Sequence, residues 1–473
     1  MNATHKSPWI AQFDGLVSRE AIRLRAEFAP DSIPDLLTQP AHLASASLST
    51  TLKKIIVLSE PDLDLLTRLV QRSHAYAVEA YPSVSRYMTT LHSREIQISS
   101  PAPVCLTGLA GTGKSTLLTA LERALPDPTE LQIGAALVDR VLSFRSHART
   151  NVKSSRDFVE ILAPWLPQES QDKGENLQAV HREQLPKKKS KMSLGSATES
   201  ATRHSYRVGL YASLVDEMQF FTQDATANAT PTKFLLMMSY LGVPLVYSAN
   251  YSLCNKLLKR NQEDRDRLLS DIVVVRPLEL TEQGLGPVLR IYDRVLKDCV
   301  KGSLCEFIPQ YAAMTLGIKR KIRELTVAAF EEMRRRNESK LTLQHLKSAY
   351  ERGLSQPFRN DVQCLHQLNS VNKPVAGQSD LWCPFGIEYN RFTLLPSMGD
   401  GGLEQNVTGT LLRQSLTADE KNLVAGFERP HHLESASPVE SEMQARPPKV
   451  QKRKREHTAA ELLSNTISHQ NRT

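Results

Sequence analysis

A glycine-rich segment is the first part of this chain whose residues could do chemistry. Residues 108–115 read Gly-Leu-Ala-Gly-Thr-Gly-Lys-Ser and match the pattern G-x-x-x-x-G-K-[ST] at every fixed position. Glycines recur in such a loop because the backbone must wrap closely around phosphate groups, with N–H groups pointing inward where a side chain would block them. The segment therefore predicts a phosphate-binding loop for ATP.

Two side chains at the end of this loop have separate expected roles. Lys114 would reach the β- and γ-phosphates, and the hydroxyl of Ser115 would ligate Mg²⁺. The helix that begins here would point the positive end of its dipole at the anion. We therefore predict ATP and Mg²⁺ as cofactors. The predicted nucleotide-binding residues are Gly108, Gly111, Thr112, Gly113, Lys114, Ser115, Thr116 and Asp216.

A pair of acidic residues ends an apolar run further along the chain. Asp216 and Glu217 follow Leu210–Val215. Asp216 is predicted to be a second Mg²⁺ ligand, and Glu217 is placed to act as the general base that polarises the attacking water. An apolar run that ends in Asp-Glu is also common where a strand enters a turn. Its position after the phosphate loop and before another predicted strand favours the catalytic interpretation.

The next predicted strand also ends in polar residues. It closes with the sequence Val-Tyr-Ser-Ala-Asn over residues 246–250. A polar side chain at this strand end could orient the lytic water against the γ-phosphate. Asn250 is the first candidate for that role and Ser248 is the reserve. The alternative is that Asn250 only forms a turn.

Short apolar runs separated by helical patterns must position these residues. This alternation is typical of a parallel sheet that is covered on both faces, and it predicts an α/β fold. The predicted strands are Val104–Thr107, Val138–Phe144, Leu210–Val215, Leu245–Ser248 and Ile272–Val275.

With 473 residues, the chain is too long for one compact core, so we expect several domains. The predicted organisation is a helical N-terminal module (1–95), a nucleotide-binding core (96–278) with a basic flexible insertion (168–200), a helical lid (279–355) and a C-terminal extension (356–473). The extension is rich in polar residues and basic clusters, and we expect it to be a largely disordered tail.

Charge and cysteine content indicate what kind of partner and which cellular compartment to expect. The net charge of +8 favours an anionic partner. The six cysteines form no disulfide framework, which fits a reducing cytoplasm. No secretory signal and no apolar run long enough to span a membrane are visible, so we expect a cytoplasmic protein without a membrane partner. Cys364, His366 and Cys383 lack a fourth zinc ligand, and the segment 382–385 is interpreted as a hydrophobic patch that packs on the lid or receives a partner.

The order of these motifs resembles that of the AAA+ ATPases. A phosphate loop, an Asp-Glu strand, a polar strand end and a helical segment with Gly-Ile-Lys-Arg at 317–320 follow one another. The resemblance implies that Arg320 acts as a sensor of the γ-phosphate. It also implies an arginine finger supplied to a neighbouring subunit, for which Arg265 and Arg267 are the candidates. The alternative for these two arginines is an ordinary solvated helix face.

Within that superfamily the chain resembles the TniB/TnsC group of ATP-dependent transposition regulators over about residues 80–355. The likeness rests on Tyr-Pro-Ser-Val at 81–84, the loop 108–116, Val-Asp-Glu-Met-Gln at 215–219, Gly-Val-Pro-Leu-Val at 242–246 and the segment from Gly317. It implies an ATP hydrolase that assembles as a homo-oligomeric ring or filament on DNA. Such a protein would regulate transposition, a form of DNA recombination, by linking target-selector proteins to a transposase.

A basic run supports binding to double-stranded DNA from the residues themselves. It follows the second predicted core strand, contains no acid, and comprises Arg145, Arg149, Lys153 and Arg156. Such a run neutralises phosphates without reading bases, so binding would be sensitive to salt and tolerant of sequence. Two alternatives stay open: an ATPase of replication initiation or helicase loading, and a signalling or defence switch that does not bind DNA.

Overall fold

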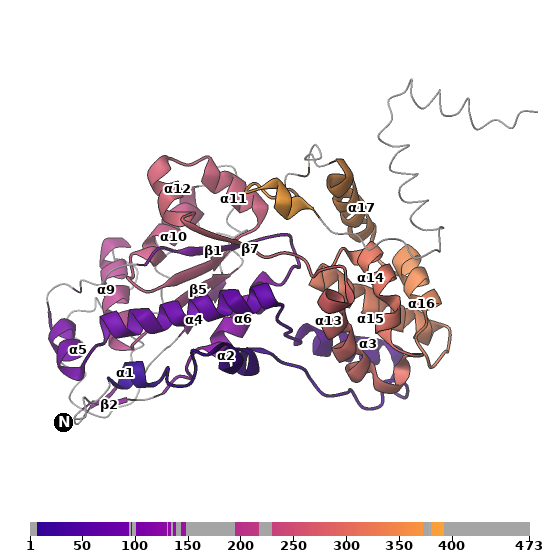
Figure 1. The fold of residues 1–473 in the computed structure, drawn as a ribbon, viewed down its shortest axis with the longest axis horizontal. Helices are drawn as coiled ribbons and strands as arrows, with labels where there is room; N and C mark the ends of the chain where they lie inside the picture. The colour runs from indigo at the N-terminus through magenta and orange to yellow at the C-terminus, as the bar shows by residue number, and fades with distance from the viewer. Residues whose placement is uncertain are drawn as a thin grey trace, which may run out of the picture. The chain divides into compact units, whose positions relative to one another are not determined.

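A parallel sheet of five short strands forms the centre of the fold (Figure 1). The strands lie in the order β4-β5-β6-β1-β7, and every neighbouring pair is parallel. Their bounds are β1 (Val104–Thr107), β4 (Ser143–His147), β5 (Ala212–Asp216), β6 (Leu245–Ser248) and β7 (Asp271–Val274). Strands β1, β5 and β6 are buried at every position, which explains their apolar sequences. The carboxyl ends of all five strands share one edge.

This computed structural model describes residues 7–93, 96, 101–129, 131–133, 136–138, 143–147, 194–216, 229–371, 378 and 380–391. They all belong to one compact unit, Met1–Leu411. No helix within these ranges is long and apolar enough to cross a membrane.

The strand predicted over 138–144 is wrong in its bounds. Val138 ends β3 (Ala136–Val138), which pairs with β2 (Leu131–Ile133) in a separate antiparallel pair. The strand of the main sheet begins only at Ser143. Because β4 lies at the edge of the sheet and pairs with β5 alone, it does not need the apolar run that marks a central strand.

Helices cover both faces of the sheet. Figure 1 shows α10, α11 and α12 on one side and α2, α4 and α6 on the other. The first group comprises α10 (Ala229–Ser239), α11 (Tyr251–Leu258) and α12 (Gln262–Leu268). The second comprises α2 (Arg19–Ala26), α4 (Glu60–Ala80) and α6 (Lys114–Ala124). Among the described residues, three further helices belong to this part: α1 (Pro8–Ala11), α5 (Val84–Leu91) and α9 (Leu194–Arg207).

A second hydrophobic core holds together the helical lid. Its helices are α13 (Glu282–Leu296), α14 (Ile308–Thr315), α15 (Lys319–Arg335), α16 (Leu343–Ser348) and α17 (Gln356–Val371). One N-terminal helix joins them: α3 (Ala41–Lys53) packs on α15. The guanidinium of Arg334 fastens this contact by donating to the carbonyls of Leu36 (2.5 Å) and Gln39 (3.0 Å).

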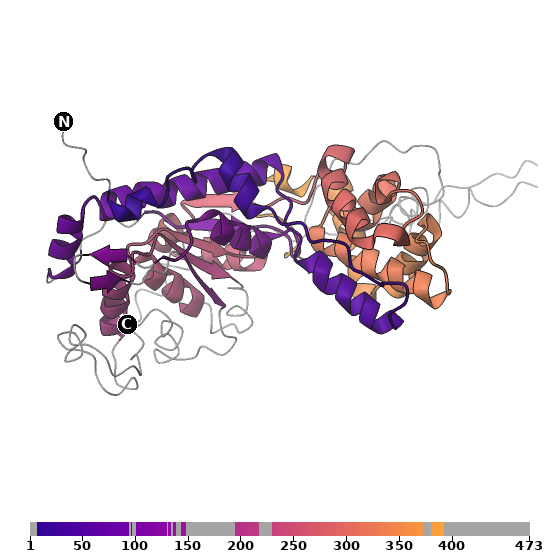
Figure 2. The same cartoon turned by 90° about the horizontal axis from the view of Figure 1, so that it is seen from below.

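The helices of the predicted N-terminal module (1–95) are divided between these two cores. Trp9, Leu66 and Tyr87 from α1, α4 and α5 lie in the sheet core, whereas Leu48 from α3 lies in the lid core. Figure 2 shows α3 among the lid helices while its chain neighbours lie against the sheet. The proposed boundary at 95 therefore does not coincide with a separate hydrophobic core among the described residues.

The ends of the other predicted segments are also visible. The last residues of the proposed insertion, 194–200, form the first turns of α9. Helix α17 extends the lid beyond the proposed boundary at 355, because Phe358, Val362 and Leu365 bury their side chains in the lid core. The rest of the insertion and the tail beyond 391 lie outside the described residues.

Candidate nucleotide-binding site

The phosphate loop connects β1 to α6, and three glycines allow its path. Gly108, Gly111 and Gly113 have φ values of 149°, 87° and 109°, in the left-handed region that favours glycine. A Cβ on Gly108 would lie 2.4 Å from the carbonyl oxygen of Val275, and a Cβ on Gly111 would lie 2.7 Å from the Cβ of Arg320. The loop is therefore pressed between the chain after β7 and the start of α15.

Lys114 is the first residue of α6, and its side chain contacts the backbone at the start of the loop. Its Nζ donates to the carbonyl oxygens of Gly108 (2.8 Å) and Leu109 (2.9 Å). Burial and the nearby charge of Arg320 lower the pKa of Lys114 to about 8, although Asp216 acts in the opposite direction. The ammonium can exchange these carbonyls for phosphate oxygens, which would stabilise its charge far better.

Asp216 ends β5 and is almost fully buried, with 1% of its surface exposed. Its Oδ1 accepts a hydrogen bond of 2.5 Å from the Oγ of Ser248 at the end of β6, the neighbouring strand. Ser115 lies in the first turn of α6. A hydroxyl and a carboxylate are the oxygen donors that Mg²⁺ prefers, so this pair fits the predicted metal. Glu217 lies outside the described residues.

Asn250 occupies the N-cap of α11. Its Oδ1 accepts the backbone N–H of Leu253 at 3.0 Å, a standard way of satisfying an unpaired donor at a helix start. The structure thus places the first candidate for the water-orienting role in a cap. The reserve candidate, Ser248, is the residue that contacts Asp216.

The start of α15 contacts the phosphate loop directly. Gly317 has a φ of 70°, and a Cβ there would lie 2.2 Å from the carbonyl oxygen of Leu278. The backbone N–H of Leu278 also donates to the carbonyl of Gly317 at 2.9 Å, which fixes the turn into the helix. Three residues later the N–H of Arg320 donates to the carbonyl of Gly111 at 3.0 Å. Arg320 is therefore next to the loop whose bound phosphate it is predicted to sense.

The two predicted finger arginines, Arg265 and Arg267, lie in α12. Arg265 is half-buried, whereas Arg267 is exposed. The guanidinium of Arg267 stacks on the ring of Tyr240, 4.7 Å from its centroid, and donates to the phenol oxygen at 2.5 Å. Because 54% of Tyr240 is itself exposed, the pair presents a positive charge at the surface. Their role toward a neighbouring subunit stays a prediction.

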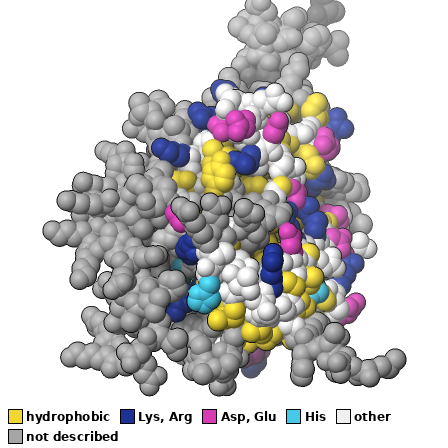
Figure 3. All heavy atoms as spheres, turned by 90° about the vertical axis from the view of Figure 1, so that its left-hand side faces the viewer, with side chains coloured by type: hydrophobic (Ala, Val, Ile, Leu, Met, Phe, Trp, Pro, Cys, Tyr) yellow, Lys and Arg dark blue, Asp and Glu magenta, His cyan; other side chains and the backbone are white. Residues whose placement is uncertain are grey.

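The predicted DNA contacts fall almost wholly outside the described residues. Arg145 lies in β4, but its side chain is not among those described, and Arg149, Lys153 and Arg156 lie beyond them. On the face shown in Figure 3, the coloured basic and acidic side chains are intermingled. DNA binding through the run 145–156 stays a prediction.

A cavity of about 260 Å³ lies beside α6 and was not foreseen from the sequence. Its lining comprises three cations, two hydroxyls and two apolar side chains: Lys53, Lys54, Arg123, Thr116, Thr119, Phe28 and Ile56. A β-bridge between Phe28 and Ile56 brings two distant segments together, and Arg123 stacks over the Phe28 ring at 5.2 Å. One of its lining residues, Thr116, directly follows Ser115 in α6. No local motif marks the cavity.

The segment 380–391 packs on the lid core, as predicted for the hydrophobic patch at 382–385. Cys383 is buried, and its N–H donates to the Oδ1 of Asn390 at 2.8 Å. His366 contacts the carbonyl of Ala313 in α14 at 2.9 Å. Across the described ranges, no group of three or more His, Cys, Asp or Glu side chains is placed to hold a metal ion.

The fold class predicted from the sequence is confirmed by the part of the chain that the structure describes. A phosphate loop follows β1, an inner strand of a parallel sheet, and a helical lid meets that loop, which together define an α/β P-loop core with a helical lid.

Comparison with known proteins finds distant structural likenesses. No protein-family profile and no curated protein sequence match this chain. It is similar to the ORC1 protein of Aeropyrum pernix in complex with DNA, with 17% identity and a TM-score of 0.40, over 78% of this chain and 85% of that one. It is also similar to the ORC2 protein of Aeropyrum pernix in its ADPNP–ADP complexes, with 10% identity and a TM-score of 0.40, over 78% of this chain and 85% of that one. A third similar structure is the RuvB Holliday junction branch migration motor of Thermotoga maritima, with 12% identity and a TM-score of 0.35, over 67% of this chain and 79% of that one. Any functional conclusion therefore rests on the residues of this chain.

Proposed function

We propose that this chain is an ATP hydrolase of the AAA+ type whose activity depends on assembly. The observation that supports this most directly is the hydrogen bond from the N–H of Arg320 to the carbonyl of Gly111, which joins the lid to the phosphate loop. A bound nucleotide at that loop would be covered by the lid, and its γ-phosphate would lie within the influence of a lid arginine.

The residues of the site divide the chemistry between them. The backbone of 108–116 would hold the phosphates, and Lys114 would reach the β- and γ-phosphates. Ser115 and Asp216 would hold Mg²⁺, whose charge would neutralise phosphate oxygens when it is bound. Glu217 would accept a proton from the attacking water, while Asn250 would orient that water.

We further propose that subunits assemble on double-stranded DNA and regulate transposition. The resemblance to the TniB/TnsC group and the basic run 145–156 support this. In such an assembly Arg265 or Arg267 of one subunit would reach the nucleotide of the next. Hydrolysis would then require neighbours, and DNA would stimulate it by bringing subunits together.

ATP turnover with and without duplex DNA, combined with electron microscopy, tests the proposal. The wild-type protein should form rings or filaments on DNA with ATP, and DNA should raise its turnover. Glu217→Gln should bind ATP, barely hydrolyse it and remain assembled on DNA. Lys114→Ala serves as the control that binds no nucleotide.

Each negative outcome removes a defined part of the proposal. Absence of any ring or filament on DNA would exclude the transposition role. Turnover that ignores DNA would favour the signalling switch. Wild-type turnover by Glu217→Gln would show that another residue is the general base. Co-purification with a transposase, rather than with replication proteins, would separate the two DNA-dependent alternatives.

A further inference from the structure

An ion pair connects the lid to the N-terminal helix α4 across the phosphate loop. The Nζ of Lys319 lies 3.2 Å from the Oδ2 of Asp62, and 257 residues separate the two in the sequence. The side chains are only 19% and 13% exposed. Water screens such a pair much less than one at the surface, and removal of one partner leaves a charge that is poorly solvated.

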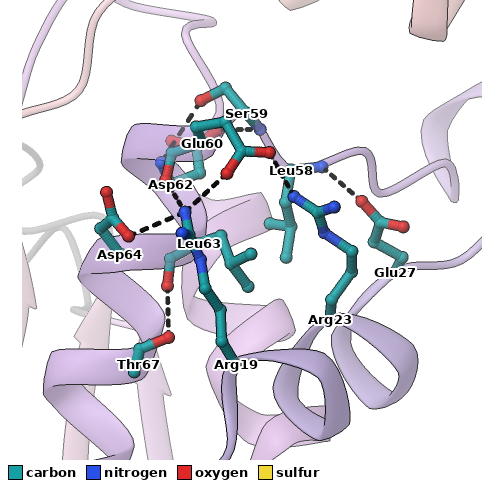
Figure 4. A network of polar contacts seen from close by, with 10 residues as sticks. All are labelled: Arg19, Arg23, Glu27, Leu58, Ser59, Glu60, Asp62, Leu63, Asp64 and Thr67. Atoms are coloured by element: carbon teal, nitrogen blue, oxygen red, sulfur yellow. Dashed lines mark hydrogen bonds and ion pairs between the residues drawn. The ribbon is translucent and has the colours of Figure 1, made fainter.

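Asp62 is fixed in place by the start of α4 (Figure 4). Its Oδ2 accepts the N–H of Ser59 at 3.3 Å, and its own N–H donates to the Oγ of Ser59 at 3.3 Å, which is a complete capping box. The positive end of the α4 dipole also favours a carboxylate here. Lys319 therefore meets an anion that has little freedom to move.

Neighbouring ion pairs brace this helix start against α2. Arg19 contacts Glu60 at 2.6 Å and Asp64 at 2.8 Å, and Arg23 contacts Glu60 at 2.5 Å (Figure 4). Each of these pairs is substantially exposed, so each contributes little alone. Together they set the position of the first turn of α4, and with it Asp62, relative to the sheet core.

Lys319 reaches Asp62 by lying over the phosphate loop. A Cβ on Gly113 would lie 3.1 Å from the Cδ of Lys319, so the aliphatic part of the lysine covers that glycine. Lys319 is also the first residue of α15 and directly precedes Arg320. The N–H of Arg320, which has no partner within its own helix, is satisfied by the carbonyl of Gly111.

We propose that Lys319 and Asp62 form a positioning pair that holds the start of α15 on the phosphate loop and thereby aims Arg320 at the γ-phosphate. This inference rests on the proposed ATP hydrolysis. Neither residue is assigned a contact with the substrate. The pair acts through Arg320, so its loss should lower kcat more than it weakens ATP binding.

Two substitutions and their combination test the pair. Asp62→Asn removes the charge but keeps an oxygen for the capping box, and Lys319→Met keeps the aliphatic cover of Gly113. If the two residues act only through each other, each single variant should lose about tenfold in kcat and the double variant no more than that. The KM for ATP should stay within about twofold in all three variants.

Lys321→Met is the matched control. Lys321 lies in the same helix and forms an ion pair of the same length, 3.2 Å, but with Asp361 of α17 inside the lid. It should lower the melting temperature of the protein without a selective loss of kcat. An equal loss of kcat in this control, or a loss in the double variant that multiplies the two single losses, would show that the Lys319–Asp62 pair has only a general structural role.

Hydrogen exchange without nucleotide separates this inference from the proposed function. The amide of Arg320 reports its bond to Gly111, and it should exchange about tenfold faster in Lys319→Met and Asp62→Asn but not in Lys321→Met. Unchanged exchange in the two variants would overturn the pair as a positioning device. If the wild-type protein failed to hydrolyse ATP, the proposed function would fall while this measurement still decided the role of the pair.

Discussion

The protonation of Lys114 should depend on whether a nucleotide is bound. Without phosphate, its ammonium donates to two loop carbonyls, in a buried place beside the charge of Arg320. A bound phosphate would supply the missing negative charge. Binding should therefore be linked to protonation of this one side chain.

This linkage predicts that ATP affinity falls with rising pH. Because the pKa of Lys114 is lowered to about 8, the nucleotide-free protein loses this charge above that pH. The Kd of a non-hydrolysable ATP analogue should rise with pH above about pH 8, by up to about tenfold per pH unit. The same shift makes the free energy of unfolding of the nucleotide-free protein increase as the pH rises from about 8 to 10.5, because over that range the unfolded chain keeps a proton that the folded chain has lost. A Kd that does not change up to pH 9 would contradict this assignment.

Asn250 allows a test that separates capping from catalysis. Asn250→Ser keeps a good N-cap for α11 but shortens the side chain. We expect an unchanged melting temperature and a loss of kcat of at least about tenfold, as for a residue that acts only in the transition state. If kcat is unchanged in this variant and falls in Ser248→Ala instead, the strand-end role belongs to Ser248.

The residues that were predictable share one property, which is that their pattern is local. The phosphate loop is recognised from eight consecutive residues, and Asp216 is recognised because it comes directly after an apolar strand. The Ser248–Asp216 bond depends on which strands are neighbours, which the chain order alone does not give. The Lys319–Asp62 pair depends on how the lid docks, and the cavity beside α6 depends on a bridge between Phe28 and Ile56. Such features arise from tertiary contacts that leave no periodicity in the sequence.

At the scale of elements, the turn between α14 and α15 decides whether the lid meets the loop. Gly317 sits where backbone of the linker at Leu278 leaves no room for a side chain, and its φ of 70° disfavours other residues. The two segments are joined by one backbone hydrogen bond of 2.9 Å. A change at this single position should therefore displace a whole helix.

Gly317→Ala should destabilise the protein by at least about 2 kcal/mol, from backbone strain and the clash with the Leu278 carbonyl. Denaturant unfolding measures this loss, and amide exchange at Arg320 should rise in parallel. Gly353→Ala is the matched control, because a Cβ there would make only ordinary contacts, 3.6 Å from the Cβ of Ala328. It should change stability by less than about 1 kcal/mol. Equal losses in both variants would show that the turn has no special role.

At the scale of the whole molecule, all site residues that the structure describes lie in one compact unit, Met1–Leu411. The basic cluster at 449–455 lies outside the described residues. Its expected role is contact with a partner, by charge, rather than catalysis.

Deletion of residues 440–473 should leave ATP turnover unchanged within about twofold, because no proposed site residue is removed. The same truncation should weaken binding to a partner, which a pull-down with the transposase or a DNA-binding titration would measure. Loss of ATP hydrolysis in the truncated protein would show that the tail contributes to the folded core.

The membership of α3 in the lid core has a consequence for how the chain is made. Leu48 and Leu52 of α3 bury against helices whose sequence begins only at Glu282. A ribosome needs on the order of tens of seconds to cover that distance. During synthesis the helices that cover the apolar face of α3 are therefore made long after α3 itself. Helix α3 can therefore complete its packing only after the lid is translated, and a chain released before that point would expose the apolar face of α3 to chaperones and proteases.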